Sequence, residues 1–67
     1  MSALDQLTPR EYEIALLIAE GHRLKDIAEK LSRSIKTIET HKQRIKVKME
    51  ITTSVQWMTF LREFPYA

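Results

Sequence analysis

The residues between 25 and 48 combine basic side chains with side chains that can hydrogen-bond nucleic-acid bases. Residues 22–48 carry nine Lys and Arg against three Asp and Glu, a net charge of +6, whereas the segments on either side are net negative. This asymmetry indicates a surface that binds a polyanion, although a solvated lysine-rich helix would give the same charge. Six side chains are of the types that contact phosphates and base edges: Lys36, Thr37, Glu39, Thr40, Gln43 and Arg44.

A helix-turn-helix would place these side chains in a DNA groove. The apolar spacing predicts a helix over 24–31 and, after a short turn, a second helix over 35–49, so that the motif spans about 24–48. Ala28 is the small residue needed where the two helices cross, and Ser34 is an N-cap. The apolar residues expected at the crossing are Ile27, Leu31, Ile35 and Ile38. In such a motif the second helix enters the major groove, but ordinary helical hairpins share the pattern.

Capping boxes predict one further helix on each side of the motif. In each box a Thr is followed three residues later by Glu or Gln, as at Thr8 and Glu11 and at Thr53 and Gln56. The predicted helices run over 9–20, where Gly21 ends the first, and over 53–64, where Pro65 prevents continuation. Residues 1–6 and 65–67 are expected to be loose tails.

The last predicted helix is more apolar than a small core requires. Val55 and Met58 form one of its flanks, and the other is formed by Trp57, Phe60, Leu61 and Phe64. One flank must cover the core, so a second apolar flank suggests an interface with a partner. We expect the larger flank to form this interface; the alternative is that Trp57 only covers the core.

Length and composition exclude most other classes of protein. A chain of 67 residues forms one small domain, expected over 1–67 with its core at about 7–64, and low Gly and Pro content favours an all-α fold. The absence of Cys excludes disulfides, thiolate metal sites and a Cys nucleophile. His22 and His41 have no neighbouring ligand types, and Ser34 with His41 lacks a third catalytic group. We therefore expect no cofactor, no metal, no membrane segment and no enzyme activity.

Four segments together resemble a known family: LTPRE at 7–11, AEG at 19–21, KDIAEKL at 25–31 and IKTIETH at 35–41. They are similar to the LuxR-type (GerE-like, NarL/FixJ-class) helix-turn-helix domain of bacterial transcription regulators, over about 7–62. The resemblance implies a four-helix domain of the winged-helix-like, C-terminal effector type without strands. It also implies binding to double-stranded DNA as a dimer, with the third helix in the major groove and the fourth helix at the dimer contact.

The resemblance implies roles for individual residues as well. Lys25 matches a lysine near the DNA backbone, Thr37 matches a phosphate contact, and His41 matches a histidine common in the recognition helix. The positions that usually face base edges are Glu39, Thr40 and Gln43, and the basic end of the helix carries Lys46 and Lys48. The dimer helix carries Trp57, Phe60, Leu61 and Phe64.

Four positions depart from the family pattern. Glu39 stands where Lys is frequent, and it can accept a hydrogen bond from cytosine N4 or pair with Lys36 or Lys42 on the helix surface. Lys42 replaces an apolar residue, Glu50 replaces a Gly, and Trp57 replaces a small residue.

The sequence thus predicts a DNA-binding transcription regulator of the bacterial cytoplasm, at the nucleoid. Its expected partners are double-stranded DNA, a second copy through the fourth helix, and RNA polymerase or another regulator. Two alternatives remain at this point. One is a fragment resembling region 4 of a sigma factor, and the other is a protein-interaction or anti-activator module that binds through the apolar face around Trp57.

Overall fold

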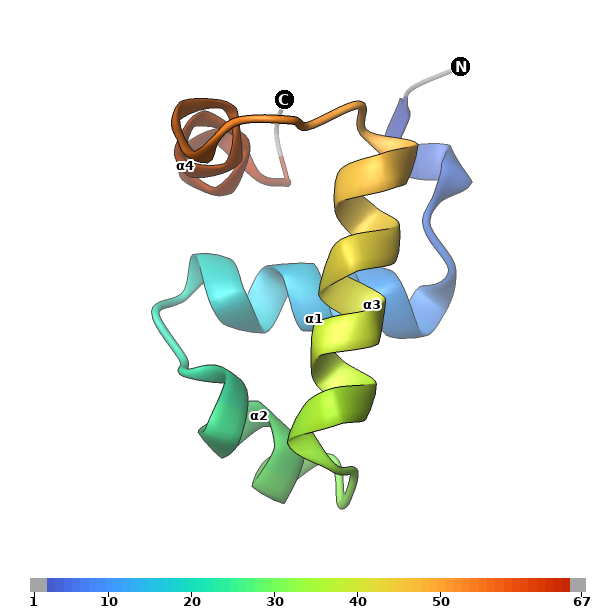
Figure 1. Cartoon of the computed structure of the whole chain (residues 1–67), viewed down its shortest axis with the longest axis vertical. Coiled ribbons are helices and arrows are strands. Elements are labelled where there is room, and N and C mark those ends of the chain that lie inside the picture. Colours follow the sequence, from blue (N-terminus) through green and yellow to red (C-terminus); the bar gives the residue numbers. More distant parts are fainter. Residues whose placement is uncertain (1–2, 66–67) are drawn as a thin grey trace.

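The computed structural model describes residues 3–65, which form helices and no strand (Figure 1). A short 3-10 helix, η1 (Ala3–Gln6), precedes four α-helices: α1 (Pro9–Ala19), α2 (Leu24–Lys30), α3 (Ile35–Lys48) and α4 (Ser54–Glu63). The all-α fold class and the helix-turn-helix of α2 and α3 are as predicted. Each α-helix ends one residue before its expected end, because that residue is the C-cap. The expectation of a loose tail is wrong for Ala3–Gln6, and residues 1–2 and 66–67 lie outside the described part.

Local capping explains where the helices begin. The Oγ1 of Thr8 accepts a hydrogen bond from the Glu11 amide at 3.1 Å, and the Thr8 amide donates to Oε1 of Glu11 at 2.9 Å. Thr53 and Gln56 form the same reciprocal box at the start of α4. Ser34 caps α3 by accepting from the amide of Thr37. These bonds satisfy amides that have no partner within their own helix, and they fix the directions in which the helices leave their turns.

Schellman motifs end α1, α2 and α3. In each, the residue after the C-cap has positive φ, with Gly21 at 99°, Ser32 at 55° and Glu50 at 57°. After α3, the amide of Ile51 donates to the carbonyl of Lys46 at 2.8 Å. Glu50 thus adopts a left-handed conformation. Glycine would occupy this conformation without strain, whereas for a residue with a Cβ it costs about 1 kcal/mol.

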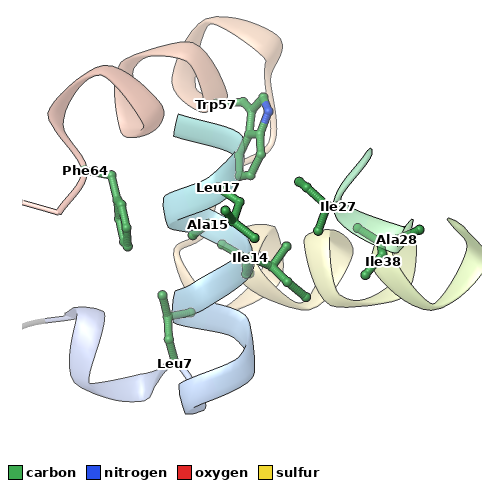
Figure 2. Packing of buried hydrophobic residues seen from close by; sticks show 10 residues of the cluster. Leu7, Ile14, Ala15, Leu17, Ile27, Ala28, Ile38, Trp57 and Phe64 are labelled. Carbon is green, nitrogen blue, oxygen red and sulfur yellow. The ribbon is translucent and has the colours of Figure 1, made fainter. Parts of the chain in front are cut away.

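The core forms around α1, which packs against α2, α3 and α4 (Figure 2). Ile14 and Ala15 of α1 are inaccessible to solvent, as are Ile38 and Ile45 of α3. The other buried apolar side chains are Leu7, Leu17, Ile27, Ala28, Trp57 and Phe64. Because α3 packs against both α1 and α2 through its inner side, the opposite side of α3 is held outward.

The expectation that Trp57 and Phe64 belong to an exposed interface is corrected by their burial. Trp57 is 8% exposed and Phe64 6%, and Trp57 points from α4 toward α1 (Figure 2). Phe60 joins the two in a row of aromatic contacts, and Phe64 also packs on Tyr12 with ring centroids 5.0 Å apart. The larger flank of α4 covers the core because it removes the most apolar surface from water.

The smaller apolar flank of α4 is therefore the exposed one. Val55 is 76% exposed and Met58 is 64% exposed. Phe60 and Leu61 are half-buried against the core. Any partner of α4 would first meet Val55 and Met58.

Candidate nucleic-acid interface

The outward side of α3 gathers most of the predicted DNA contacts. Ile38 and Ile45 fix the inner side of the helix, and the side chains opposite to them are exposed. The exposed predicted contacts on α3 are Lys36, Glu39, Thr40, Gln43 and Arg44. In Figure 1, α3 runs down the front of the molecule and crosses in front of α1.

Hydrogen bonds at the beginning of α3 orient its two threonines. Thr37 Oγ1 lies 2.9 Å from Ser34 Oγ, so this hydroxyl is tied to the N-cap. Thr40 Oγ1 donates to the carbonyl oxygen of Lys36 at 3.0 Å. Because its proton is used in this way, the Thr40 hydroxyl offers acceptor lone pairs to DNA, which suits the amino group of cytosine or adenine.

Glu39 is exposed on the same side of α3 and is not neutralised by its helix neighbours. Among residues 3–65 it forms no ion pair, so the expected surface pairs with Lys36 or Lys42 are absent. An unpaired carboxylate beside a groove is repelled by phosphates, but it can accept a hydrogen bond from cytosine N4. Glu39 is therefore an unpaired carboxylate, among the described residues, on the side of α3 that carries the other predicted base contacts.

Lys48, a predicted phosphate contact, is instead paired within the protein. Its Nζ lies 2.6 Å from Oε1 of Glu11, whose side chain is 2% exposed. The same carboxylate oxygen accepts the Thr8 amide in the capping box. Lys48 therefore joins the end of α3 to the beginning of α1 inside the protein.

The pKa of Glu11 reflects this position. Burial by itself raises the pKa of the carboxyl, but the hydrogen bonds from Lys48 and from the Thr8 backbone, with the charge of Lys48, lower it further than burial raises it. The net pKa lies below the usual value, so Glu11 and Lys48 form an ion pair at neutral pH.

Two other lysines of α3 are placed by the indole ring of Trp57. Nζ of Lys42 lies 5.4 Å from the ring centroid and Nζ of Lys46 lies 5.3 Å from it, within the range of a cation–π contact. Both lysines are half-buried. The two departures Lys42 and Trp57, which look unrelated in the sequence, are therefore in contact.

The remaining predicted contacts lie at the edges of this surface. Lys25 is exposed at the beginning of α2. His41 is half-buried on the inner side of α3, and its Nδ1 is buried without a hydrogen-bond partner in the described structure. That position favours a packing role for His41 over a contact through Nδ1. No group of three potential metal ligands occurs within the described residues.

Two exposed residues near this surface were not selected from the sequence. Val47 is 67% exposed and continues the outward stripe of Lys36, Thr40 and Gln43. Arg33 is exposed in the turn directly before α3. A helical wheel of 35–48 would have identified Val47, because it lies one turn after Gln43.

None of the helices between residues 3 and 65 is long and apolar enough to cross a membrane.

Comparison with known proteins identifies one family. Residues 5–61 match the family described as bacterial regulatory proteins, luxR family. The chain is 44% identical over 55 residues to the response regulator GacA of Pseudomonas aeruginosa, which covers 82% of this chain and 26% of GacA. It is 44% identical over 54 residues to the oxygen regulatory protein NreC of Staphylococcus haemolyticus, covering 81% of this chain and 25% of NreC.

The transcriptional regulatory protein RcsB of Escherichia coli is 38% identical over 56 residues, which covers 84% of this chain and 26% of RcsB. The chain therefore spans about a quarter of the length of these curated relatives. No solved structure gives a significant match to the chain.

Proposed function

The chain belongs to the LuxR family of bacterial regulatory proteins, whose helix-turn-helix domain binds DNA and regulates transcription, and from that premise we propose that α3 reads its operator. The observation that carries this proposal is the two-sided character of α3. Ile38 and Ile45 are inaccessible to solvent, whereas the basic and polar side chains opposite to them are exposed. A helix held in this way fits the major groove with its outward side toward the bases.

Each class of side chain has a separate task. Affinity comes mainly from phosphate neutralisation and counterion release by Lys25, Lys36, Arg44 and Lys46. Sequence choice comes from Glu39, Thr40 and Gln43, which carry the donors and acceptors that face base edges. Thr37 contacts a phosphate at the beginning of α3, where its backbone amide and hydroxyl are already ordered by Ser34.

A homodimer through α4 would place two copies of α3 in successive major grooves, about 34 Å apart. The exposed side chains Val55 and Met58, with Phe60 and Leu61 behind them, supply the apolar surface for this contact. The DNA target puts the domain in the bacterial cytoplasm at the nucleoid, where it acts on RNA polymerase directly or through another regulator.

The alternative of a protein-interaction module is weakened by the burial of Trp57 and Phe64. That alternative requires the aromatic flank of α4 to face a partner, and this flank is instead used by the core of the domain.

Binding of a labelled 20-bp duplex, followed by fluorescence anisotropy over a range of salt concentrations, tests the assignment of α3. Lys36→Gln should weaken binding to every sequence and reduce the slope of log K against log salt by about 1, the loss of one phosphate contact. Arg62→Gln, which removes a positive charge from an exposed position on α4, is the matched control and should leave the slope unchanged. Equal slopes for the Lys36 variant and the wild type would refute the assignment.

A further inference from the structure

Trp57 contacts two lysines that belong to the same helix as the proposed base contacts. Lys42 and Lys46 are one turn apart on α3, and both ammonium groups lie within 5.4 Å of the indole centroid. Trp57 itself is 8% exposed and is packed into the core. The ring is therefore a fixed part of the domain, and both ammonium groups lie against it.

Lys46 lies on one flank of the groove-reading side of α3, and Lys42 lies beyond it on the same flank, nearer the buried side marked by Ile38 and Ile45. At about 100° per residue, Lys46 is about 60° and Lys42 about 100° around the helix from Gln43. Arg44 lies about 100° from Gln43 in the other direction. A helix in the major groove has a phosphate backbone on each side, so the two flanks face different strands. With α3 in the major groove, Lys46 and, beyond it, Lys42 would face one strand, and Arg44 would face the other.

Access to the Lys46 flank is open. Gln43 and Lys46 line a surface groove between the end of α3 and the beginning of α4, together with Val47 and Ser54. Lys42 and Lys46 form no ion pair with a carboxylate anywhere in the described part of the chain. Both ammonium groups thus lie against the ring without a carboxylate partner, and that of Lys46 also borders the open groove.

We propose that Trp57 is a positioning residue for DNA binding: it holds Lys42 and Lys46 on one flank of α3, where both bind backbone phosphates of one DNA strand. This inference rests on the proposed function of α3. It assigns a DNA contact to Lys42, and it makes α4 a determinant of affinity through a contact within one subunit.

The physical reason is preorganisation. Two lysines one turn apart repel each other, and each long side chain loses conformational freedom when it binds a phosphate. The indole ring offsets both effects before DNA arrives, since its negative face attracts the ammonium groups and limits their positions. The ring also keeps Lys42 away from Glu39, which lies three residues earlier and would otherwise compete for the ammonium group.

A double-mutant cycle between the ring and the lysines tests the proposal, with a generic 20-bp duplex at low salt as the probe. Trp57→Leu removes the aromatic face and keeps an apolar side chain, whereas Trp57→Phe keeps an aromatic face. We expect Trp57→Leu to weaken DNA binding about three- to tenfold and Trp57→Phe to restore most of that loss.

The decisive measurement repeats Trp57→Leu in a Lys42→Gln/Lys46→Gln background. The loss caused by Trp57→Leu should fall to less than twofold there, because the ring then has no ammonium group to position. An undiminished loss in that background would mean that Trp57 supports only the fold, and it would overturn the proposal. Circular dichroism of each variant shows whether the helices are retained.

If Trp57→Leu does not fold, Lys42→Gln tests by itself whether Lys42 binds DNA phosphate, because this variant leaves the indole ring in place. Lys42→Gln should weaken binding and reduce the salt slope by about 1. Trp57 is the single tryptophan of the chain, so its emission should also change when DNA binds the wild type but not the Lys42→Gln/Lys46→Gln variant. Unchanged affinity and slope for Lys42→Gln would overturn the proposal. Failure of the wild type to bind any duplex would instead refute the proposed function.

Discussion

Removal of Lys48 should destabilise the domain more than removal of the charge of Glu11, because the two partners differ in their access to water. The Glu11 side chain is 2% exposed and that of Lys48 is 31% exposed. Without Lys48, Glu11 remains as a buried carboxylate that keeps its hydrogen bonds from Thr8 but has no positive charge beside it. Without the charge of Glu11, the ammonium group of Lys48 can turn toward solvent.

The magnitude follows from the burial of the pair. Loss of one partner of a fully buried ion pair costs about 3–5 kcal/mol, and the partial exposure of Lys48 reduces this to about 2–3 kcal/mol for Lys48→Ala. Glu11→Gln, whose amide oxygen can still accept the Thr8 amide, should cost about 1 kcal/mol. A domain of this length has a free energy of unfolding of about 3–10 kcal/mol, so Lys48→Ala removes a large part of it.

The cost of Lys48→Ala should also depend on pH. Because the pKa of Glu11 is lowered in the folded state, its contribution to stability is present above the unfolded pKa and is lost as pH falls through the folded pKa. In Lys48→Ala the burial of Glu11 is no longer offset by the ammonium group, so its pKa rises and protonation relieves the buried charge. The difference in stability between the two proteins should therefore be largest at neutral pH and should shrink below about pH 4.

Urea denaturation of the wild type, Lys48→Ala and Glu11→Gln at several pH values measures these differences. Arg10→Ala is the matched control, since it breaks an exposed ion pair with Glu13 and should change stability by less than about 0.5 kcal/mol. The reasoning is refuted if Glu11→Gln costs as much as Lys48→Ala, or if the cost of Lys48→Ala is the same at pH 3 and pH 7.

Three further predictions concern the helix end and the DNA surface. Glu50→Gly should raise the free energy of unfolding by about 0.5–1 kcal/mol, because Glu50 has a φ of 57°, which glycine adopts without strain. Gly21→Ala should lower it by about 1 kcal/mol, because Gly21 has a φ of 99°. Urea denaturation that gave the opposite signs would contradict both predictions. Gln43→Ala should change the preference among randomised half-sites more than the affinity for nonspecific DNA, and an unchanged preference in a binding selection would count against a base contact. Lys48→Met should leave the salt dependence of DNA binding unchanged, since Lys48 is already paired with Glu11. A slope of log K against log salt reduced by about 1 would instead show that Lys48 contacts a DNA phosphate.

The helices and their beginnings could be predicted from the sequence because the signals are local. Thr8 with Glu11, and Thr53 with Gln56, are three residues apart, so each capping box is visible without knowledge of the fold. The outward side of α3 was predictable for the same reason, since Ile38 and Ile45 mark its inner side at helical spacing.

Contacts between helices could not be predicted from local spacing. Glu11 and Lys48 are 37 residues apart, and nothing near either residue indicates that one meets the other. A helical wheel shows that α4 has two apolar flanks, but the wheel does not say which flank meets the core; the packing of α4 on α1 buries the aromatic one. The position of Lys42 over Trp57 depends on that same packing.

The backbone at Glu50 shows a different limit. Glu50 stands where the family pattern has Gly, the residue that adopts a left-handed conformation without strain. The structure places Glu50 in the left-handed region nevertheless, with the bond from Ile51 to Lys46 closing the motif. The packing of α4 stabilises the turn by more than the local strain costs.

An NMR titration of the domain with a 20-bp duplex, at low and at raised salt, tests the central claim most directly. The amide signals of residues 35–46 should shift at low salt and return as salt is added, since phosphate contacts supply most of the affinity. Absence of shifts in α3, or shifts confined to Val55, Met58 and their neighbours on α4, would contradict the assignment of α3 as the DNA-reading helix.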